Sequence, residues 1–156
     1  MSKASTKENK TEYQNVRESL EMSRADVDNA TNGALSSSRL EKIENNIQSP
    51  RPEDVVLMAK VYNEPRLCNY YCVHECEIGK TNVPSVDTVH DLPQITMKLL
   101  SNLNSLNKDK ERIIDITSDG EISEDERNDF EVFRKHLSDM SLAIEALKIW
   151  ANKQLS

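Results

Sequence analysis

The stretch SRADVDNATNGALSSSRLEKIE, residues 23–44, decides how the first half of the chain folds. Ser23 can cap a short helix that carries Val27, since a serine side chain accepts amide hydrogens left free in the first helical turn. Thr31-Asn32-Gly33 then predicts a turn, because asparagine and glycine tolerate positive φ. The stretch therefore begins with a short helix followed by a sharp change of direction.

Three serines after this turn start another helix, and any of them can serve as its cap. We expect this helix to run from Ser36 to Asn45 and to bury Leu40 and Ile43. The side chains expected on its exposed face are Ser37, Ser38, Glu41 and Lys42.

Helices are also predicted on both sides of this pair. Upstream, Thr11 can cap a helix that places Tyr13 and Val16 on one face. Downstream, Pro52 suits the first turn of a helix rich in valine and leucine. With the segment 67–76, the first half of the chain is expected to hold five short helices and no strand.

Residues 11–65 resemble the lambda-repressor-like helix-turn-helix domain of the XRE (Cro-like) family of bacterial regulators. The resemblance is carried by Met22-Ser23-Arg24, by Leu40-Glu41-Lys42-Ile43-Glu44, and by Pro50 before the apolar Leu57-Met58-Ala59. The chain departs from the family in a turn about two residues longer and in Arg24, where the family has glutamine.

The resemblance implies a partner, double-stranded DNA, and a recognition helix that enters the major groove. Base readers would lie on that helix, while phosphate contacts would gather at the start of the second helix and after the third. The DNA-binding residues implied in this way are Ser23, Arg24, Ser36, Ser37, Ser38, Arg39, Glu41, Lys42, Asn45, Asn46 and Arg51.

The net charge of -7 is distributed unevenly along the 156 residues. Residues 1–66 hold ten basic and eleven acidic side chains, whereas residues 67–156 hold ten and sixteen. A nearly neutral first half predicts DNA binding that is modest and sensitive to salt.

The polar residues 1–10 are expected to form a disordered arm and not a secretory signal, and no apolar run of membrane-spanning length occurs. We expect a cytoplasmic protein.

The second half predicts a long antiparallel helical hairpin. Two amphipathic segments, residues 92–118 and 123–154, are separated by a tight turn at Asp119-Gly120. A lone helix pair leaves a wide apolar stripe uncovered, so the hairpin is expected to form a homodimer.

The expected organisation is an arm at 1–10, a helix-turn-helix domain at 11–66, a connector at 67–91 that is extended from Gly79 to Asp91, and the dimerisation hairpin at 92–156. The run LCNYYC and the hairpin also resemble a subgroup of uncharacterised regulators.

Cys68, Cys72 and Cys76 follow one another at four-residue steps, which keeps the three thiols near one helix face. With His74 they could complete a tetrahedral zinc site or sense oxidants. The alternative is that the thiols pack as small apolar groups beside the neighbouring tyrosines.

Residues 115–126, DITSDGEISEDE, fit the spacing of a calcium-binding loop. The matching positions are Asp115, Thr117, Asp119, Gly120, Ser123 and Glu126, although Thr117 stands where Asp or Asn is usual. The alternative needs no ion, because Gly120 can end one helix and Ser123 with Glu126 can cap the next.

No catalytic triad, metalloprotease motif or phosphate-binding glycine loop is found in the sequence, so we do not expect an enzyme. The sequence predicts an all-α protein that acts as a dimeric, sequence-specific transcriptional regulator. The alternative is a helical protein-interaction module that uses the same fold without DNA.

Overall fold

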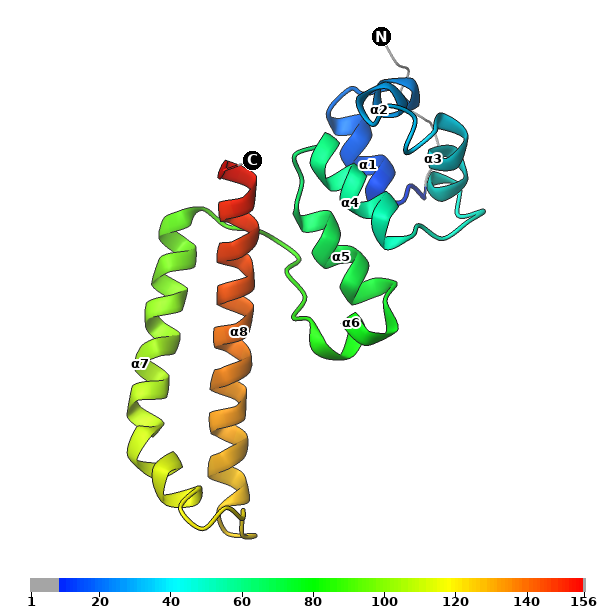
Figure 1. The fold of residues 1–156 in the computed structure, drawn as a ribbon. Helices are drawn as coiled ribbons and strands as arrows, with labels where there is room; N and C mark the ends of the chain where they lie inside the picture. The colour runs from blue at the N-terminus through cyan, green and yellow to red at the C-terminus, as the bar shows by residue number, and fades with distance from the viewer. Residues whose placement is uncertain (1–8, 156) are drawn as a thin grey trace. The chain divides into compact units, whose positions relative to one another are not determined.

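The computed structural model describes residues 9–155, and every regular element in this range is an α-helix (Figure 1), which confirms the predicted all-α class. Residues 1–8 of the predicted arm lie outside the described residues. The helices are, in chain order, α1 (Glu12–Ser19), α2 (Arg24–Ala30), α3 (Ser37–Glu44), α4 (Pro52–Val61), α5 (Arg66–His74), α6 (Glu77–Asn82), α7 (Leu92–Ile116) and α8 (Arg127–Leu155). The chain forms two compact units that meet in sequence at Val83 and Pro84, and each is described by itself.

The first three helices begin where the sequence predicted caps. The Oγ1 of Thr11 accepts a hydrogen bond from the Gln14 amide at 3.2 Å, and the Oγ of Ser23 accepts one from the Asp26 amide at 3.1 Å. Ser36 caps α3 through the Arg39 amide. These side chains satisfy donors that have no partner inside the helix, which fixes the start of each helix.

The turn between α2 and α3 has the predicted backbone. Asn32 and Gly33 adopt φ values of 52° and 81°. Thr31 lies at the end of α2, and its Oγ1 accepts from the Leu35 amide at 3.1 Å. This bond holds Leu35, which is fully buried, against the core. The turn is therefore tied to the interior by one apolar side chain.

The unit of residues 9–83, which we call the head, is built around one hydrophobic core. Leu40 and Ile43 of α3 are buried, as predicted, and face side chains from the other helices. The buried members of this core are Tyr13, Val27, Leu35, Leu40, Ile43, Val55, Met58, Ala59, Tyr62 and Leu67. Because Leu67 belongs to α5, the connector helix completes the core of the preceding helices.

The expectation of an extended segment from Gly79 to Asp91 is wrong for residues 79–82, which lie in α6. The reason is close packing between α5 and α6. A Cβ added to Gly79 would lie 2.1 Å from the carbonyl oxygen of Cys72, so only glycine lets these two backbones approach. The glycine that suggested a break in structure is thus required for a helix contact.

The unit of residues 84–154 holds the segment 84–91 and an antiparallel pair of helices, and Figure 1 shows α7 and α8 side by side along their length. The Nδ2 of Asn102 donates to the carbonyl oxygen of Asp139 at 2.9 Å, and Arg112 pairs with Asp129 at 2.7 Å. Residues later in α7 therefore contact residues earlier in α8, as an antiparallel pair requires.

The hairpin turn differs in detail from the prediction. Gly120 has φ 80°, as expected for a left-handed turn residue, but α8 begins at Arg127 and not at Ser123. Residues 123–126 form a hydrogen-bonded turn in front of the helix, with the Glu126 amide donating to the Ser123 carbonyl oxygen at 3.2 Å. Among residues 9–155, no helix is both long and apolar enough to cross a membrane.

Candidate nucleic-acid interface

Helix α3 presents a polar face on the outside of the head. Ser38 and Lys42 are exposed on this helix, and Asn45 and Asn46 are exposed just after it. Within residues 9–155, these four side chains form no hydrogen bond or ion pair with other groups. They are therefore available to an external partner, while Leu40 and Ile43 anchor the opposite face of the helix.

A buried ion-pair cluster holds α3 against the two helices before it. The fully buried carboxylate of Glu44 accepts from Arg17 twice, at 2.6 Å to Nε and 2.8 Å to Nη2. Arg24 donates to the same carboxylate from its Nε at 2.8 Å. Two-point pairing between arginine and carboxylate fixes orientation as well as distance. The cluster thus joins α1, α2 and α3 into a rigid support for the exposed face.

The cluster gives Arg24 a role that the sequence did not indicate. Its predicted place was at a DNA phosphate, but its guanidinium is directed to Glu44 inside the head, with Glu41 at 3.7 Å. Its side chain keeps about a third of its surface exposed, at 31%. Arg24 is thus a link between helices first, and only its outer edge remains for a phosphate.

Arg39 is held in a similar way. Its Nη2 lies 2.6 Å from the Oδ2 of Asp54 in α4 and 3.4 Å from the carbonyl oxygen of Ser49. The same Asp54 oxygen accepts from the Arg51 amide at 2.8 Å. These bonds join α3 to the loop and to the start of α4, so Arg39 fixes the segment that carries Asn46 and Arg51.

The serines at the start of α3 divide into structural and free positions. Ser36 caps the helix, and the amide and hydroxyl of Ser37 donate to the carboxylate of Asp28 at 2.8 and 3.0 Å. Ser38 is exposed and unbonded among the described residues. Of the three, Ser38 is the one whose hydroxyl is open to a ligand.

The start of α2 already carries a negative charge. The Asp26 carboxylate accepts from the amide and the hydroxyl of Ser23, both at 2.7 Å, in a capping box. These hydrogen bonds hold the pKa of Asp26 below its ordinary value. Because the carboxylate is exposed beside the helix N-terminus, it competes with any phosphate that approaches Ser23 there.

Sequence reasoning did not find the partners that hold these residues. Glu44 binds Arg24 from 20 residues away in the sequence. Asp54 binds Arg39 from 15 residues away, and Asp28 binds Ser37 from 9 residues away. Only the capping box at Ser23 and Asp26 has a local signal, a three-residue spacing. Partners brought together by tertiary packing leave no such pattern in a single sequence.

The three cysteines are thiols that form no disulfide among the described residues, and Cys68 packs against the head core together with Tyr70 and Tyr71. Burial, and then the neighbouring Cys72, raise the pKa of the Cys68 thiol, which favours its unreactive protonated form. His74 lies against the ring of Tyr70, with a centroid distance of 4.5 Å.

In residues 9–155, no group of three or more His, Cys, Asp or Glu side chains is arranged to hold a metal ion. The zinc alternative at Cys68, Cys72 and Cys76 therefore has no geometric support and stays a prediction. At residues 115–126, the Glu126 carboxylate accepts from the amide and hydroxyl of Ser123, at 3.0 and 2.7 Å. These bonds agree with the capping alternative, and calcium binding likewise stays a prediction.

Comparison with known families gives one result for the head. Residues 14–66 match the family model HTH_3, described as "Helix-turn-helix". The matched range begins at the third residue of α1, covers α2 to α4, and ends at the first residue of α5. No curated protein and no solved structure matches the chain. The C-terminal hairpin lies outside the matched range.

Proposed function

Because residues 14–66 form a helix-turn-helix domain of the XRE type, we propose that this protein is a sequence-specific transcriptional regulator that binds double-stranded DNA as a dimer. The observation that carries the proposal is the face of α3. Its free polar side chains stand on a helix that ion pairs and apolar contacts hold rigidly. Precise placement of such side chains is what base recognition requires.

The free side chains suit the major groove. Ser38 can donate to or accept from any base edge, and Lys42 can donate to the O6 and N7 of guanine. Asn45, Asn46 and Arg51 follow the helix, where they can reach the phosphates of the backbone. Glu41 can accept from a cytosine amino group, so it would favour some sequences and reject others.

Dimerisation is supported by apolar side chains that the hairpin leaves exposed. Leu137 and Ile144 lie seven residues apart on α8, hence on one face, and each is 45% exposed. Burying such a face against a second copy would pair two heads on one DNA duplex. Two recognition helices about 34 Å apart would then meet successive major grooves.

The proposal is tested by selecting duplexes from a random library with the full chain at ~50 mM salt, where phosphate contacts are strong. We expect an enriched motif with two-fold symmetry. The selected duplex should bind at least ~100-fold more tightly than a scrambled one. Equal binding of the two duplexes would contradict the proposal.

A second candidate function, protein binding without DNA, is favoured by the charges around the interface. Asp26 occupies the start of α2, Glu41 is exposed on α3, and Arg24 and Arg39 are engaged inside the head. A DNA-free module would fail to enrich any duplex in the selection while keeping a folded head. The same experiment therefore separates the two candidates.

A further inference from the structure

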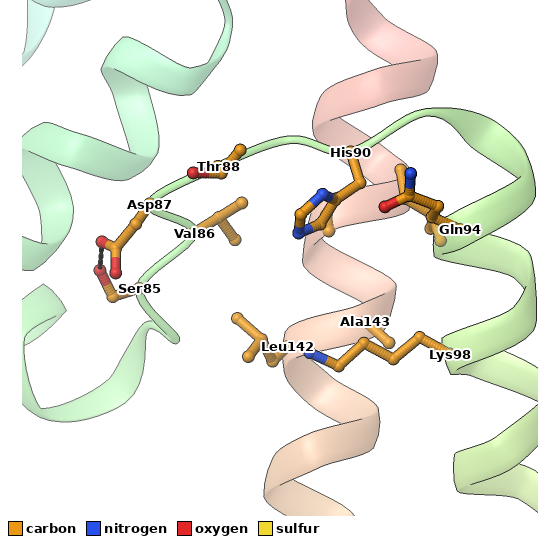
Figure 2. Close-up of a pocket in the computed structure, with 11 residues that line it drawn as sticks. Ser85, Val86, Asp87, Thr88, His90, Gln94, Lys98, Leu142 and Ala143 are labelled. Atoms are coloured by element: carbon orange, nitrogen blue, oxygen red, sulfur yellow. Dashed lines mark hydrogen bonds between the residues drawn. The ribbon is translucent and has the colours of Figure 1, made fainter.

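A pocket in the second unit lies between the segment 84–91 and the two long helices, as Figure 2 shows. Its volume is about 260 Å³. Pockets for drug-sized ligands usually hold ~300–1,000 Å³, so this one suits a smaller molecule. The hairpin thus has a second feature besides its exposed apolar face, and it belongs to neither the DNA interface nor the expected dimer surface.

The floor of the pocket is apolar and comes from three parts of the unit. Val86 from the segment, Ile95 from α7 and Ala143 from α8 are at most 5% exposed and meet beneath the opening. Leu142 and Ala146 extend the same surface along α8. An apolar body of a few carbon atoms would find contacts on several sides, which favours burial of a compact organic group.

The rim of the pocket carries a cation that has no ion-pair partner among the described residues. Lys98 is the one charged residue in the sequence between positions 92 and 107, and it forms no ion pair within residues 9–155. Figure 2 shows its side chain crossing the pocket toward Leu142, with the ring of His90 on the same opening. An ammonium group beside an apolar floor attracts an anion more strongly than one in open water.

Two carboxylates lie near Lys98, and one of them, Asp87, lines the pocket itself. Asp87 accepts from the hydroxyl of Ser85 at 2.8 Å, and Figure 2 shows its carboxylate turned away from Lys98. Asp91 caps α7 by accepting from the Gln94 amide at 3.1 Å. Neither carboxylate forms an ion pair with Lys98, so its ammonium group can bind an anion on the side of the opening away from Asp87.

We propose that this pocket binds a small organic monocarboxylate, with Lys98 holding the carboxylate while Val86, Ile95 and Ala143 contact its apolar part. The amide of Gln94 and the hydroxyl of Thr88 line the same opening and can complete the polar contacts. A regulator with such a site would take a small acid as its effector. The binding claim itself is independent of DNA recognition.

The experiment titrates the full chain, labelled with ¹³C at alanine methyl groups, with benzoate up to ~20 mM, which reaches ligands of millimolar affinity. Ala143 and Ala146 report the pocket, whereas Ala25 and Ala59 report the head. We expect saturable shifts of the first two methyl signals and none of the others. The neutral isostere benzamide should bind at least about tenfold more weakly, because it lacks the charge that Lys98 attracts.

Two variants and a matched control complete the test. Lys98→Met should weaken benzoate binding about tenfold, and Lys98→Arg should retain it, since the guanidinium also binds carboxylates. Lys108→Met, which removes an exposed lysine of the same helix outside the pocket, should leave the affinity unchanged. The proposal is overturned if no saturable shift is seen, if benzamide binds as tightly as benzoate, or if Lys98→Met and Lys108→Met behave alike.

Discussion

The head and the hairpin are both helical, but they handle their apolar and charged side chains in opposite ways. In the head, ten apolar residues form one core, and the Glu44 carboxylate is buried between two arginines. In the hairpin, Leu137 and Ile144 remain about half exposed, and the ion pair between Arg112 and Asp129 stands on the surface. Ile47 and Ile78 are exposed on the head, but large exposed apolar side chains are more numerous on the hairpin, which indicates that the hairpin has more surface left for partners.

The largest effect is expected from removing the carboxylate at the centre of the head. Glu44→Ala removes the two-point partner of the buried Arg17 guanidinium, which keeps only the Met22 carbonyl oxygen and Glu18 at 3.6 Å. This loss should cost ~3–5 kcal/mol of the head's unfolding free energy. Urea unfolding followed by circular dichroism measures this loss. Trp150 is the one tryptophan of the chain, so its fluorescence reports the hairpin separately and should change little.

Glu41→Ala is the control on the same helix. Its carboxylate is exposed and lies 3.7 Å from Arg24, so its removal should alter stability by no more than ~0.5 kcal/mol. If Glu44→Ala is equally mild, the head does not depend on its buried ion pair and the contrast with the hairpin is lost.

The next effect concerns the exposed face of α8. The double change Leu137→Ser and Ile144→Ser should raise the dimer dissociation constant at least ~100-fold, equivalent to ~2.7 kcal/mol, because each copy loses two apolar contacts. Sedimentation equilibrium measures it. Lys135→Ser changes an exposed residue on another side of α8 and should leave association unaltered. A wild-type chain that is monomeric at ~100 µM would remove the basis of this prediction.

A smaller effect is expected where α5 and α6 touch. Gly79→Ala places a methyl group 2.1 Å from the Cys72 carbonyl oxygen, so one of the two helices must shift. We expect a loss of ~1–3 kcal/mol, as is usual when a packed contact is overfilled. Gly120→Ala serves as the comparison, since its added methyl group meets nothing within 4 Å and only its φ of 80° opposes the change. Hydrogen exchange of the α6 amides should speed up in the first variant alone.

The smallest effect tests the charge at the start of α2. Asp26→Asn keeps a group that can accept from Ser23 but removes a negative charge that repels a phosphate near the start of the helix. DNA affinity should therefore rise about two- to fivefold in fluorescence anisotropy. Unchanged affinity in this variant would show that no phosphate approaches the start of α2.

The sequence was sufficient to predict most of the fold. The caps at Thr11, Ser23 and Ser36, the turn at Asn32-Gly33 and the antiparallel hairpin all follow from local spacing and periodicity. The helix α6 was missed because the reason for Gly79 is a contact with Cys72, which only the folded chain brings near. Local rules find elements, whereas close contacts between elements depend on the assembled structure.

The candidate interface was predictable only in outline. Its position on α3 follows from the apolar spacing of Leu40 and Ile43, which leaves the other face exposed. The division into free and engaged residues could not be predicted, because Arg24 and Arg39 find their carboxylates on other helices. Of the predicted contact residues, Ser38, Lys42, Asn45 and Asn46 keep side chains free within the described part of the chain.

The most direct test of the central claim is an amide NMR titration of the full chain with its selected duplex. We expect the largest shift changes at Ser38, Lys42, Asn45 and Asn46, and only small changes in α7 and α8. Lys42→Ala should weaken binding to the selected duplex and relax the preference at one base pair, and Lys60→Ala, on α4, should not. Large changes confined to the hairpin, or none in α3 at saturation, would show that α3 does not bind DNA.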